Sequence, residues 1–299
     1  MRNWINLAAA VLLFIGGNVL FASFLSAGMR RTYGLSKDSE LLILGHSHIM
    51  LALNAGVLER GLKVSVSKYT REGVTVAERK LMAEQYLAEH KAGKLRLVVY
   101  GVDPYLFNSA GLSENSCINF YPMFDDPVIA PYIRKNTTHG EYCKLLLLPL
   151  CRFHDAAVNA GISGWFRTGR GSFKTGRVDL GKVRYDIRQG KVRRITIQPE
   201  SLRLFRKTIR LFTERGIRVI LLNTPILDLY NALEPEAHAE VDAVFRDTAR
   251  DPLAEYWDLN PIYEHDYELF RDPIHLNRGG QTRVSEFLAE KLRHEILAN

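Results

Sequence analysis

Residues 40–48 read Glu-Leu-Leu-Ile-Leu-Gly-His-Ser-His, an apolar run that ends in a glycine and a polar cluster. A short continuous apolar run is typical of a strand buried on both faces of a sheet. Gly45 predicts a turn after this strand, and Ser47 then stands at the start of a helix. There its hydroxyl lies near free backbone N–H groups, which stabilise an oxyanion. A Gly-x-Ser turn is also common as a helix cap or phosphate cradle, so this segment alone leaves the function open.

Strand patterns alternate with helical patterns along the rest of the chain. Pro199 and Gly216 mark the two ends of one expected helix. The expected strands are residues 40–45, 62–69, 95–101, 217–223 and 256–259, and the expected helices are residues 74–90, 199–215, 241–250 and 280–297. This alternation predicts an α/β fold, a three-layer α/β/α sandwich around a mostly parallel sheet.

A second polar segment lies just before the last expected helix, where residues 271–277 read Arg-Asp-Pro-Ile-His-Leu-Asn. Sites in open α/β sheets form at the carboxyl ends of the strands, where both polar segments are expected. A spacing of three lets the carboxylate of Asp272 reach one ring nitrogen of His275, which leaves the other nitrogen as a general base. In the alternative interpretation, Asp272 caps a turn and His275 is an ordinary surface histidine.

Together, the Gly-x-Ser turn after the first strand and the Asp-x-x-His pair before the last helix resemble the SGNH (GDSL-like) hydrolase superfamily. The resemblance covers roughly residues 40–299, apart from a long stretch at 104–197. It implies that Ser47 is the nucleophile and that Asp272 and His275 complete a Ser-His-Asp triad. Such an enzyme requires no metal or other cofactor, and none is expected.

The same resemblance maps a backbone donor to the oxyanion onto Gly73, but two other positions depart from the family pattern. The acidic residue that usually precedes the nucleophile is His46 here. The third block, normally Gly-x-Asn-Asp, reads Gly-Val-Asp-Pro, with Asp103 in place of the asparagine. An ionised carboxylate cannot donate a hydrogen bond. The backbone N–H groups of Ser47 and Gly73 are therefore the expected oxyanion donors.

The N-terminal region contains an uncharged run from Trp4 to Ala27. At about 1.5 Å per residue, a helix of this length crosses a hydrocarbon core of roughly 30 Å. The alternative is a cleaved signal peptide, whose apolar region usually has only about 7–15 residues. The sequence therefore predicts a membrane anchor at residues 1–30 and a hydrolase-like domain at residues 31–299.

The side of the membrane on which the hydrolase-like domain lies is inferred from the family resemblance. Arg30, Arg31 and Lys37 outnumber the positive charges of Arg2 and the amino terminus, so the positive-inside rule would place the domain in the cytoplasm. The chain is instead similar to a membrane-anchored branch of the SGNH superfamily, whose members D-alanylate teichoic acids or O-acetylate exopolysaccharides. The shared features are the anchor, the Gly-x-Ser-His motif, the Gly-x-Asp-Pro block and the Asp-Pro-x-His-Leu-Asn run. This branch implies a single-pass protein of the cytoplasmic (inner) membrane with its catalytic domain outside. Its expected partners are an acylated or acyl-accepting envelope polymer and a multi-spanning membrane acyltransferase.

Residues 104–197 separate the third and fourth expected strands and are too long for a simple crossover. Long insertions often carry function, such as a lid or a substrate platform. The aromatic residues of the first half equally suit a peripheral subdomain with its own small core: Tyr105, Phe107, Phe120, Tyr121, Phe124 and Tyr132. Three cysteines leave at least one thiol without an intramolecular partner, and Cys143 with Cys151 is the candidate disulfide.

Basic residues are concentrated in one segment of a chain whose net charge is +7 and whose pI is near 9.3. Between Trp165 and Arg194, only two acidic residues oppose ten basic ones: Arg167, Arg170, Lys174, Arg177, Lys182, Arg184, Arg188, Lys191, Arg193 and Arg194. This segment carries +8, so the remainder sums to about −1. Such a patch predicts contact with an anionic polymer or lipid headgroups. No nucleic-acid partner is expected, because no binding motif accompanies the charge.

Two other interpretations stay open. His46-x-His48 also resembles the metal pair that opens amidohydrolase barrels, but a metal needs further ligands and a barrel needs more strands. The altered third block also suits a catalytically degenerate protein that binds an envelope polymer or scaffolds an assembly. Hydrolysis and acyl transfer use the same residues, so the sequence does not choose between them.

Overall fold

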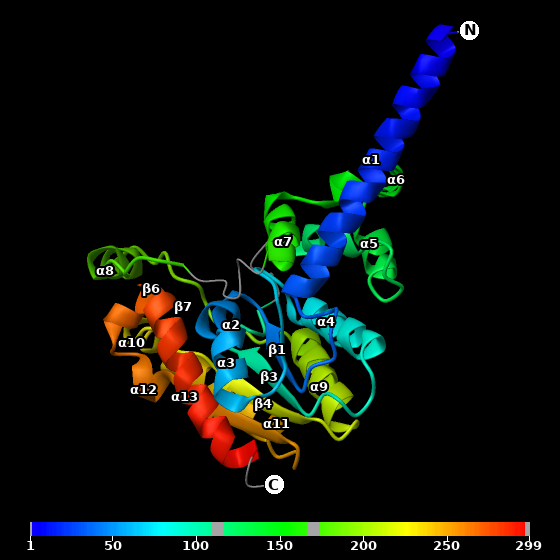
Figure 1. Cartoon of the computed structure of the whole chain (residues 1–299). Coiled ribbons are helices and arrows are strands. Elements are labelled where there is room, and N and C mark those ends of the chain that lie inside the picture. Colours follow the sequence, from blue (N-terminus) through cyan, green and yellow to red (C-terminus); the bar gives the residue numbers. More distant parts are fainter. Residues whose placement is uncertain (1, 109–115, 167–173, 297–299) are drawn as a thin grey trace. The chain divides into compact units, whose positions relative to one another are not determined.

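The structure, a computed structural model, describes residues 2–108, 116–166 and 174–296 (Figure 1). The chain divides into two compact units, Met1–Ser36 with Asn115–Gly169 and Lys37–Glu114 with Arg170–Asn299. The N-terminal helix therefore belongs to the same unit as the middle of the predicted insertion. The expected limits of the anchor at residue 30 and of the insertion at 104 and 197 stay predictions.

The larger unit is built on five parallel strands in the order β2-β1-β3-β4-β5. Their bounds are β1 (Leu41–Gly45), β2 (Val66–Thr70), β3 (Leu97–Val102), β4 (Arg218–Asn223) and β5 (Ala254–Asp258). All five strands were expected from the sequence. The chain runs from β1 to β2 on one side and then crosses back to β3 on the other. A reversal of this kind leaves a crevice at the carboxyl ends of β1 and β3.

Helices cover both faces of this sheet, which confirms the predicted three-layer α/β/α fold (Figure 1). On one face, α13 (Arg278–Ile296) packs against α2 (Ser47–Ala52) and α3 (Ala55–Leu62). These helices share a core with alternate strand residues such as Ile43, Val99 and Ile220. On the other face, α4 (Val76–Glu89) packs against α9 (Pro199–Thr213), and α11 (Pro235–Thr248) contacts β5.

Helix α3 was missed by the sequence analysis, because two glycines in its eight residues lower helix propensity. Its start is fixed by Asn54, whose side chain accepts a hydrogen bond from the backbone N–H of Val57 at 3.2 Å. This helix occupies the chain up to Leu62, so β2 begins later than expected. The shorter elements of this unit are α8 (Leu180–Arg188), α10 (Asp228–Asn231), α12 (Asn260–Tyr263), η3 (Tyr267–Leu269), β6 (Phe270–Asp272) and β7 (His275–Leu276).

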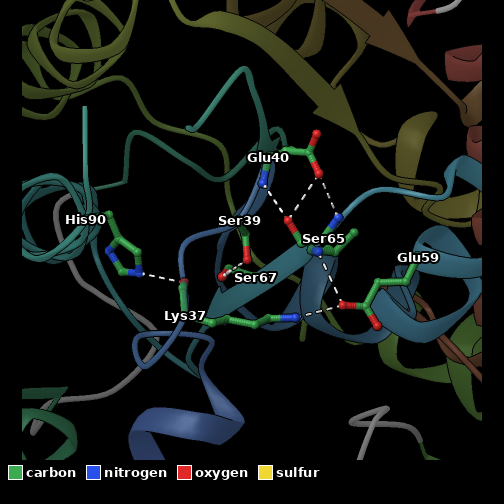
Figure 2. Close-up of polar contacts among 8 residues, drawn as sticks. Lys37, Ser39, Glu40, Glu59, Ser65, Ser67 and His90 are labelled. Atoms are coloured by element: carbon green, nitrogen blue, oxygen red, sulfur yellow. Dashed lines mark hydrogen bonds and ion pairs between the residues drawn. The ribbon is translucent and has the colours of Figure 1, made fainter. Parts of the chain in front are cut away.

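Polar contacts fix the segment that leads into β1, at the amino end of the sheet (Figure 2). Lys37 Nζ lies 2.8 Å from a carboxylate oxygen of Glu59, and the Lys37 carbonyl oxygen lies 2.9 Å from His90 Nε2. Two residues further on, the hydroxyls of Ser39 and Ser67 are 2.8 Å apart. The segment is thus tied to α3, to β2 and to the end of α4 before β1 begins.

The smaller unit contains α1 (Arg2–Thr32), which is long and apolar enough to cross a membrane, although a signal sequence meets the same criterion. Its C-terminal half packs closely on α7 (Asp155–Phe166): a Cβ on Gly28 would lie 1.8 Å from the carbonyl oxygen of Gly161. Thr32 Oγ1 also donates to the carbonyl of Ala160 at 2.6 Å. The remaining elements are η1 (Ser116–Met123), α5 (Ala130–Asn136), α6 (His139–Leu147) and η2 (Pro149–Arg152).

The aromatic residues of the predicted insertion divide between the two units. Phe107 packs on Phe205, within the larger unit, at a centroid distance of 5.3 Å. In the smaller unit, Phe120 packs on Tyr132 at 5.5 Å, and both Phe120 and Phe124 are buried. This agrees with a subdomain core rather than an exposed aromatic platform.

The candidate disulfide between Cys143 and Cys151 is not formed, because all three cysteines are free thiols. Cys143 Sγ instead lies 3.6 Å from His139 Nε2, one turn earlier on α6. The possible pairing of these two cysteines is therefore not found.

Candidate active site

Ser47 is the first residue of α2, directly beyond the carboxyl end of β1. Helix α2 approaches the sheet closely here, since a Cβ on Gly45 or on Gly101 of β3 would lie 2.7 Å from side-chain atoms of Ile49. The two glycines therefore allow the helix to begin over the crevice between β1 and β3. Ser47 is 8% exposed, so its hydroxyl lies in a largely enclosed position.

Asp272 and His275 lie opposite one another in a small antiparallel hairpin, β6–β7. His275 Nδ1 is 3.0 Å from each carboxylate oxygen of Asp272, and His275 Nε2 is 3.0 Å from Ser47 Oγ. The hydroxyl, the imidazole and the carboxylate thus form one continuous hydrogen-bonded series. This is the geometry expected from the sequence, although Ser47 and His275 are separated by 228 positions.

The environment of Asp272 favours its ionised form. Burial alone would raise the pKa of this carboxyl group. The hydrogen bond and charge of His275, the backbone N–H of Ile274 and the charge of Arg271 outweigh burial, and the pKa of Asp272 lies below its ordinary value. A carboxylate at this position holds the proton of the facing imidazole on Nδ1 and leaves Nε2 to accept the proton of Ser47.

The loop that carries Gly73 reaches the same edge of the sheet. Gly45 pairs with Thr70 at the end of β2, and its carbonyl oxygen accepts a hydrogen bond from the N–H of Arg71 at 3.2 Å. Gly73 is buried and has a φ of 70°, a left-handed conformation that favours glycine. Donation of its N–H to an oxyanion stays a prediction.

Asp103, at the position where the SGNH pattern has asparagine, is fully buried beyond the end of β3. Its Oδ2 lies 3.1 Å from His46 Nε2 and 3.9 Å from a guanidinium nitrogen of Arg79, and its Oδ1 accepts from the N–H of Tyr105 at 3.0 Å. The two departures from the SGNH pattern therefore contact each other. Arg79 was not identified from the sequence, because nothing in the pattern of α4 marks it; only the fold brings it to this carboxylate.

The buried imidazoles of this cluster are neutral at pH 7. Burial, together with the charge of Arg79, lowers the pKa of His46 to about 4, and burial likewise places the pKa of His48 well below its ordinary value. Burial would raise the pKa of Asp103, but His46, His48 and Arg79 together hold it below its ordinary range. The cluster reaches His275 through ring contacts, at 4.6 Å from His46 to His48 and 5.1 Å from His48 to His275.

The same cluster is the candidate metal site among the described residues. His46, His48 and Asp103 each offer a ligand atom, all within 4.8 Å of one another, and Nδ1 of both imidazoles is buried without a hydrogen-bond partner in the described part of the chain. Asp103 is thus a third donor that the sequence analysis did not find. Arg79 already balances its charge, and a divalent ion would have to lie beside that guanidinium. The interpretation as an amidohydrolase barrel is wrong, since the main sheet is open and five-stranded.

Lys68 and Gln281 fix the far end of the helix that begins with Ser47. Lys68 Nζ donates to the carbonyls of Met50 and Leu53, both at 2.7 Å, and Gln281 Nε2 donates to those of Met50 and Leu51. These contacts satisfy carbonyl groups that have no partner within α2. They hold the helix, and with it Ser47, against the sheet and α13.

Residues 174–178 of the basic segment run beside the hairpin that carries His275. The Val178 N–H donates to the carbonyl of Phe270 at 3.0 Å, and Asn277 Nδ2 donates to the carbonyl of Gly176 at 3.1 Å. Further along, Arg184 and Arg188 are exposed on α8. Arg167 and Arg170 lie outside the described residues. The anionic partner of this segment stays a prediction.

A cavity of about 640 Å³ lies at the opposite, amino end of the strands. It is lined by the first residues of three strands, Leu41, Leu97 and Arg218, and by Tyr86 of α4. Neither Ser47 nor His275 borders it. The cavity is therefore separate from the site at the carboxyl ends of the strands.

No family model and no curated protein matches this chain. Solved structures with a related arrangement include a candidate SGNH hydrolase from Slackia heliotrinireducens, at 12% identity and a TM-score of 0.43, covering 86% of this chain and 100% of that one. A candidate acylhydrolase from Bacteroides fragilis has 10% identity and a TM-score of 0.42, covering 86% and 87% of the two chains. Similarity at this level assigns neither a family nor an activity.

Proposed function

We propose that this protein is a serine esterase or O-acyltransferase of the SGNH type, which works through an acyl-serine intermediate. One observation carries the proposal: the 3.0 Å contact between Ser47 Oγ and His275 Nε2, with Asp272 on the opposite ring nitrogen. A nucleophile, a base within hydrogen-bonding distance and a third group that orients the base are the elements of nucleophilic acyl transfer.

In the first step, Ser47 Oγ attacks the carbonyl carbon of an ester or thioester while His275 Nε2 takes the hydroxyl proton. The resulting oxyanion accepts hydrogen bonds from the backbone N–H groups of Ser47 and Gly73. His275 then returns its proton to the leaving group, and the acyl-serine remains. Water or a carbohydrate hydroxyl then attacks the acyl carbon while His275 takes its proton. The bond to Ser47 Oγ breaks, His275 returns the proton to Ser47, and an acid or a new ester is released. Asp272 stays ionised throughout and steadies the imidazolium.

For the substrate, we propose an acyl group carried by a cell-envelope polysaccharide or a similar anionic polymer. The exposed Arg184 and Arg188 of α8 and the position of residues 174–178 beside the His275 hairpin support this choice. The length and composition of α1 support attachment to the cytoplasmic membrane, and the family resemblance supports an extracytoplasmic site and a multi-spanning acyltransferase as partner. No part of the proposal involves nucleic acid.

The experiment that tests the chemistry uses an alkyl fluorophosphonate, which is attacked by an activated serine with loss of fluoride, and intact-mass detection. The wild-type protein should gain one phosphonyl group, and Ser47→Ala should gain none; equal labelling of both removes the proposal. Incubation with an activated acyl ester, with and without glycan acceptors, then separates hydrolysis from transfer.

A second candidate function is an envelope-polymer-binding scaffold without catalysis. The observation that favours it is Asp103, whose ionised carboxylate replaces a side-chain donor to the oxyanion. A properly folded wild-type protein that ignores the phosphonate but binds an anionic polymer would identify this function instead.

A further inference from the structure

Two leucines at the corner between α6 and η2 of the smaller unit are exposed. Residues 145–150 read Leu-Leu-Leu-Leu-Pro-Leu, in which Leu145 is fully buried while Leu146 and Leu147 are 54% and 74% exposed. A single exposed leucine is ordinary. Two consecutive ones at the end of a helix, within an apolar run of six residues, form a continuous apolar projection.

This corner is attached to α1 within the apolar run of that helix. The Asn18 side chain accepts a hydrogen bond from the backbone N–H of Leu150 at 3.0 Å, which gives this polar side chain a partner. Asn18 precedes Ala27, the last residue of the uncharged run, by nine positions. At about 1.5 Å per residue, the contact lies roughly 13 Å inside the apolar run. Leu20 and Phe21, close to Asn18 in α1, are 69% and 61% exposed.

The attachment continues along α1 through α7, so the corner is fixed in depth. Trp165 Nε1 donates to the carbonyl of Phe24 at 2.9 Å, the two rings are stacked at 5.0 Å, and the Arg31 guanidinium lies 3.8 Å from the Trp165 ring centroid. Tryptophan and arginine are residues of the membrane–water interface. They contact α1 at residues 24–31, whereas the leucine corner meets α1 nearer its N-terminus, on the hydrocarbon side of that level.

We infer that the α6–η2 corner enters the lipid bilayer beside α1, with Leu146 and Leu147 among the acyl chains. The smaller unit thus holds the membrane by two elements, a spanning helix and an apolar corner that enters the bilayer beside it. Lys144, exposed just before the leucines, can extend its charge towards the headgroups while its methylene stem stays in apolar surroundings. This inference rests on the anchoring role proposed for α1.

The test is electron paramagnetic resonance on the full chain in vesicles of phosphatidylethanolamine and phosphatidylglycerol. Spin labels are placed singly at Leu147→Cys, at Leu13→Cys on α1 as the bilayer reference and at exposed Lys135→Cys on α5 as the aqueous reference. The native cysteines are replaced by serine: Cys117, Cys143 and Cys151. Each label is measured for accessibility to oxygen, which concentrates in lipid, and to a water-soluble nickel chelate.

We expect label 147 to follow label 13, with an oxygen-to-nickel ratio several-fold above that of label 135. High nickel access at 147 would overturn the inference, and low access to both reagents would show a protein partner in place of lipid, which overturns it too. If label 13 reports the bilayer and label 147 reports water, the corner does not enter the lipid, but α1 still acts as the membrane anchor. Aqueous signals at both refute the anchor itself. Thermal melting of each labelled variant confirms that the fold is kept.

Discussion

His46 Nε2 lies 3.1 Å from Asp103 Oδ2, so the two positions at which this chain departs from the SGNH pattern are direct neighbours in space. The pattern places an acid before the nucleophile and an amide after the third strand. Here an imidazole stands at the first position and an acid at the second. One carboxylate is kept in the cluster, and Arg79, 3.9 Å from the same oxygen, balances its charge.

This arrangement predicts a compensating pair of substitutions. Asp103→Asn alone leaves the buried Arg79 guanidinium without its counter-charge, and breaking a buried pair costs about 3–5 kcal/mol. Adding His46→Asp returns a carboxylate to the cluster and places an amide donor beside it. We expect urea unfolding to show a large decrease in the free energy of unfolding for Asp103→Asn and a much smaller decrease for the double variant. Losses that simply add would contradict this coupling.

The buried histidines predict acid sensitivity of the fold. The pKa of His46 is about 4 in the folded protein, against about 6.5 when unfolded, so the unfolded state binds more protons between these values. Stability is therefore lost as the pH falls from about 6.5 to 4, by about 3 kcal/mol from His46, and the lowered pKa of His48 adds to the loss.

Urea unfolding at several pH values from 7.5 to 4.5 measures this effect. The variant His46→Gln should show a shallower fall across this range. The matched control is His265→Gln, which removes a histidine that is 73% exposed, and it should keep the wild-type slope. An unchanged slope in His46→Gln would show that burial of this imidazole does not govern the acid response.

The sequence revealed the parts of the site that local spacing determines. Ser47 follows an apolar run and a glycine, and Asp272 and His275 are three residues apart, so both segments were visible before the fold was known. Arg79 was not visible, because its role depends on α4 passing beneath the end of β3. The link between His46 and Asp103 was hidden for the same reason, although each had been noted as a departure.

The fold shows the same division between local and tertiary information. The five parallel strands were predictable because buried apolar runs are distinctive. Helix α3 was not, since Gly56 and Gly61 weaken its helical pattern and Asn54 supplies the cap that starts it. The smaller unit joins α1 to residues more than a hundred positions later, a grouping that Gly28, Gly161 and Gly164 permit by close packing.

The contact between Asp272 and His275 predicts a specific catalytic defect. Asp272→Asn presents an amide, which can favour the wrong imidazole tautomer and cannot stabilise the imidazolium. Turnover of an activated ester should fall about 10³–10⁴-fold, with a smaller change in KM. The control is Asp247→Asn, the same change at an exposed carboxylate on α11, which should retain most of the activity. A mild loss in Asp272→Asn would mean that the carboxylate does not orient His275.

The last prediction concerns the exposed face of α8, where Arg184 and Arg188 are one helical turn apart. If this face meets an anionic polymer, removing both charges should weaken binding and reduce its dependence on salt, since exposed charges are screened beyond about 8–10 Å at physiological ionic strength. The double variant Arg184→Gln/Arg188→Gln is compared with Lys207→Gln/Arg210→Gln, which removes two exposed charges from α9. Binding to a polyanionic glycan at 50 and 300 mM salt should weaken several-fold only in the α8 variant, most clearly at low salt. Equal losses in both variants would indicate a general effect of net charge, and no loss in either would remove α8 from the binding surface.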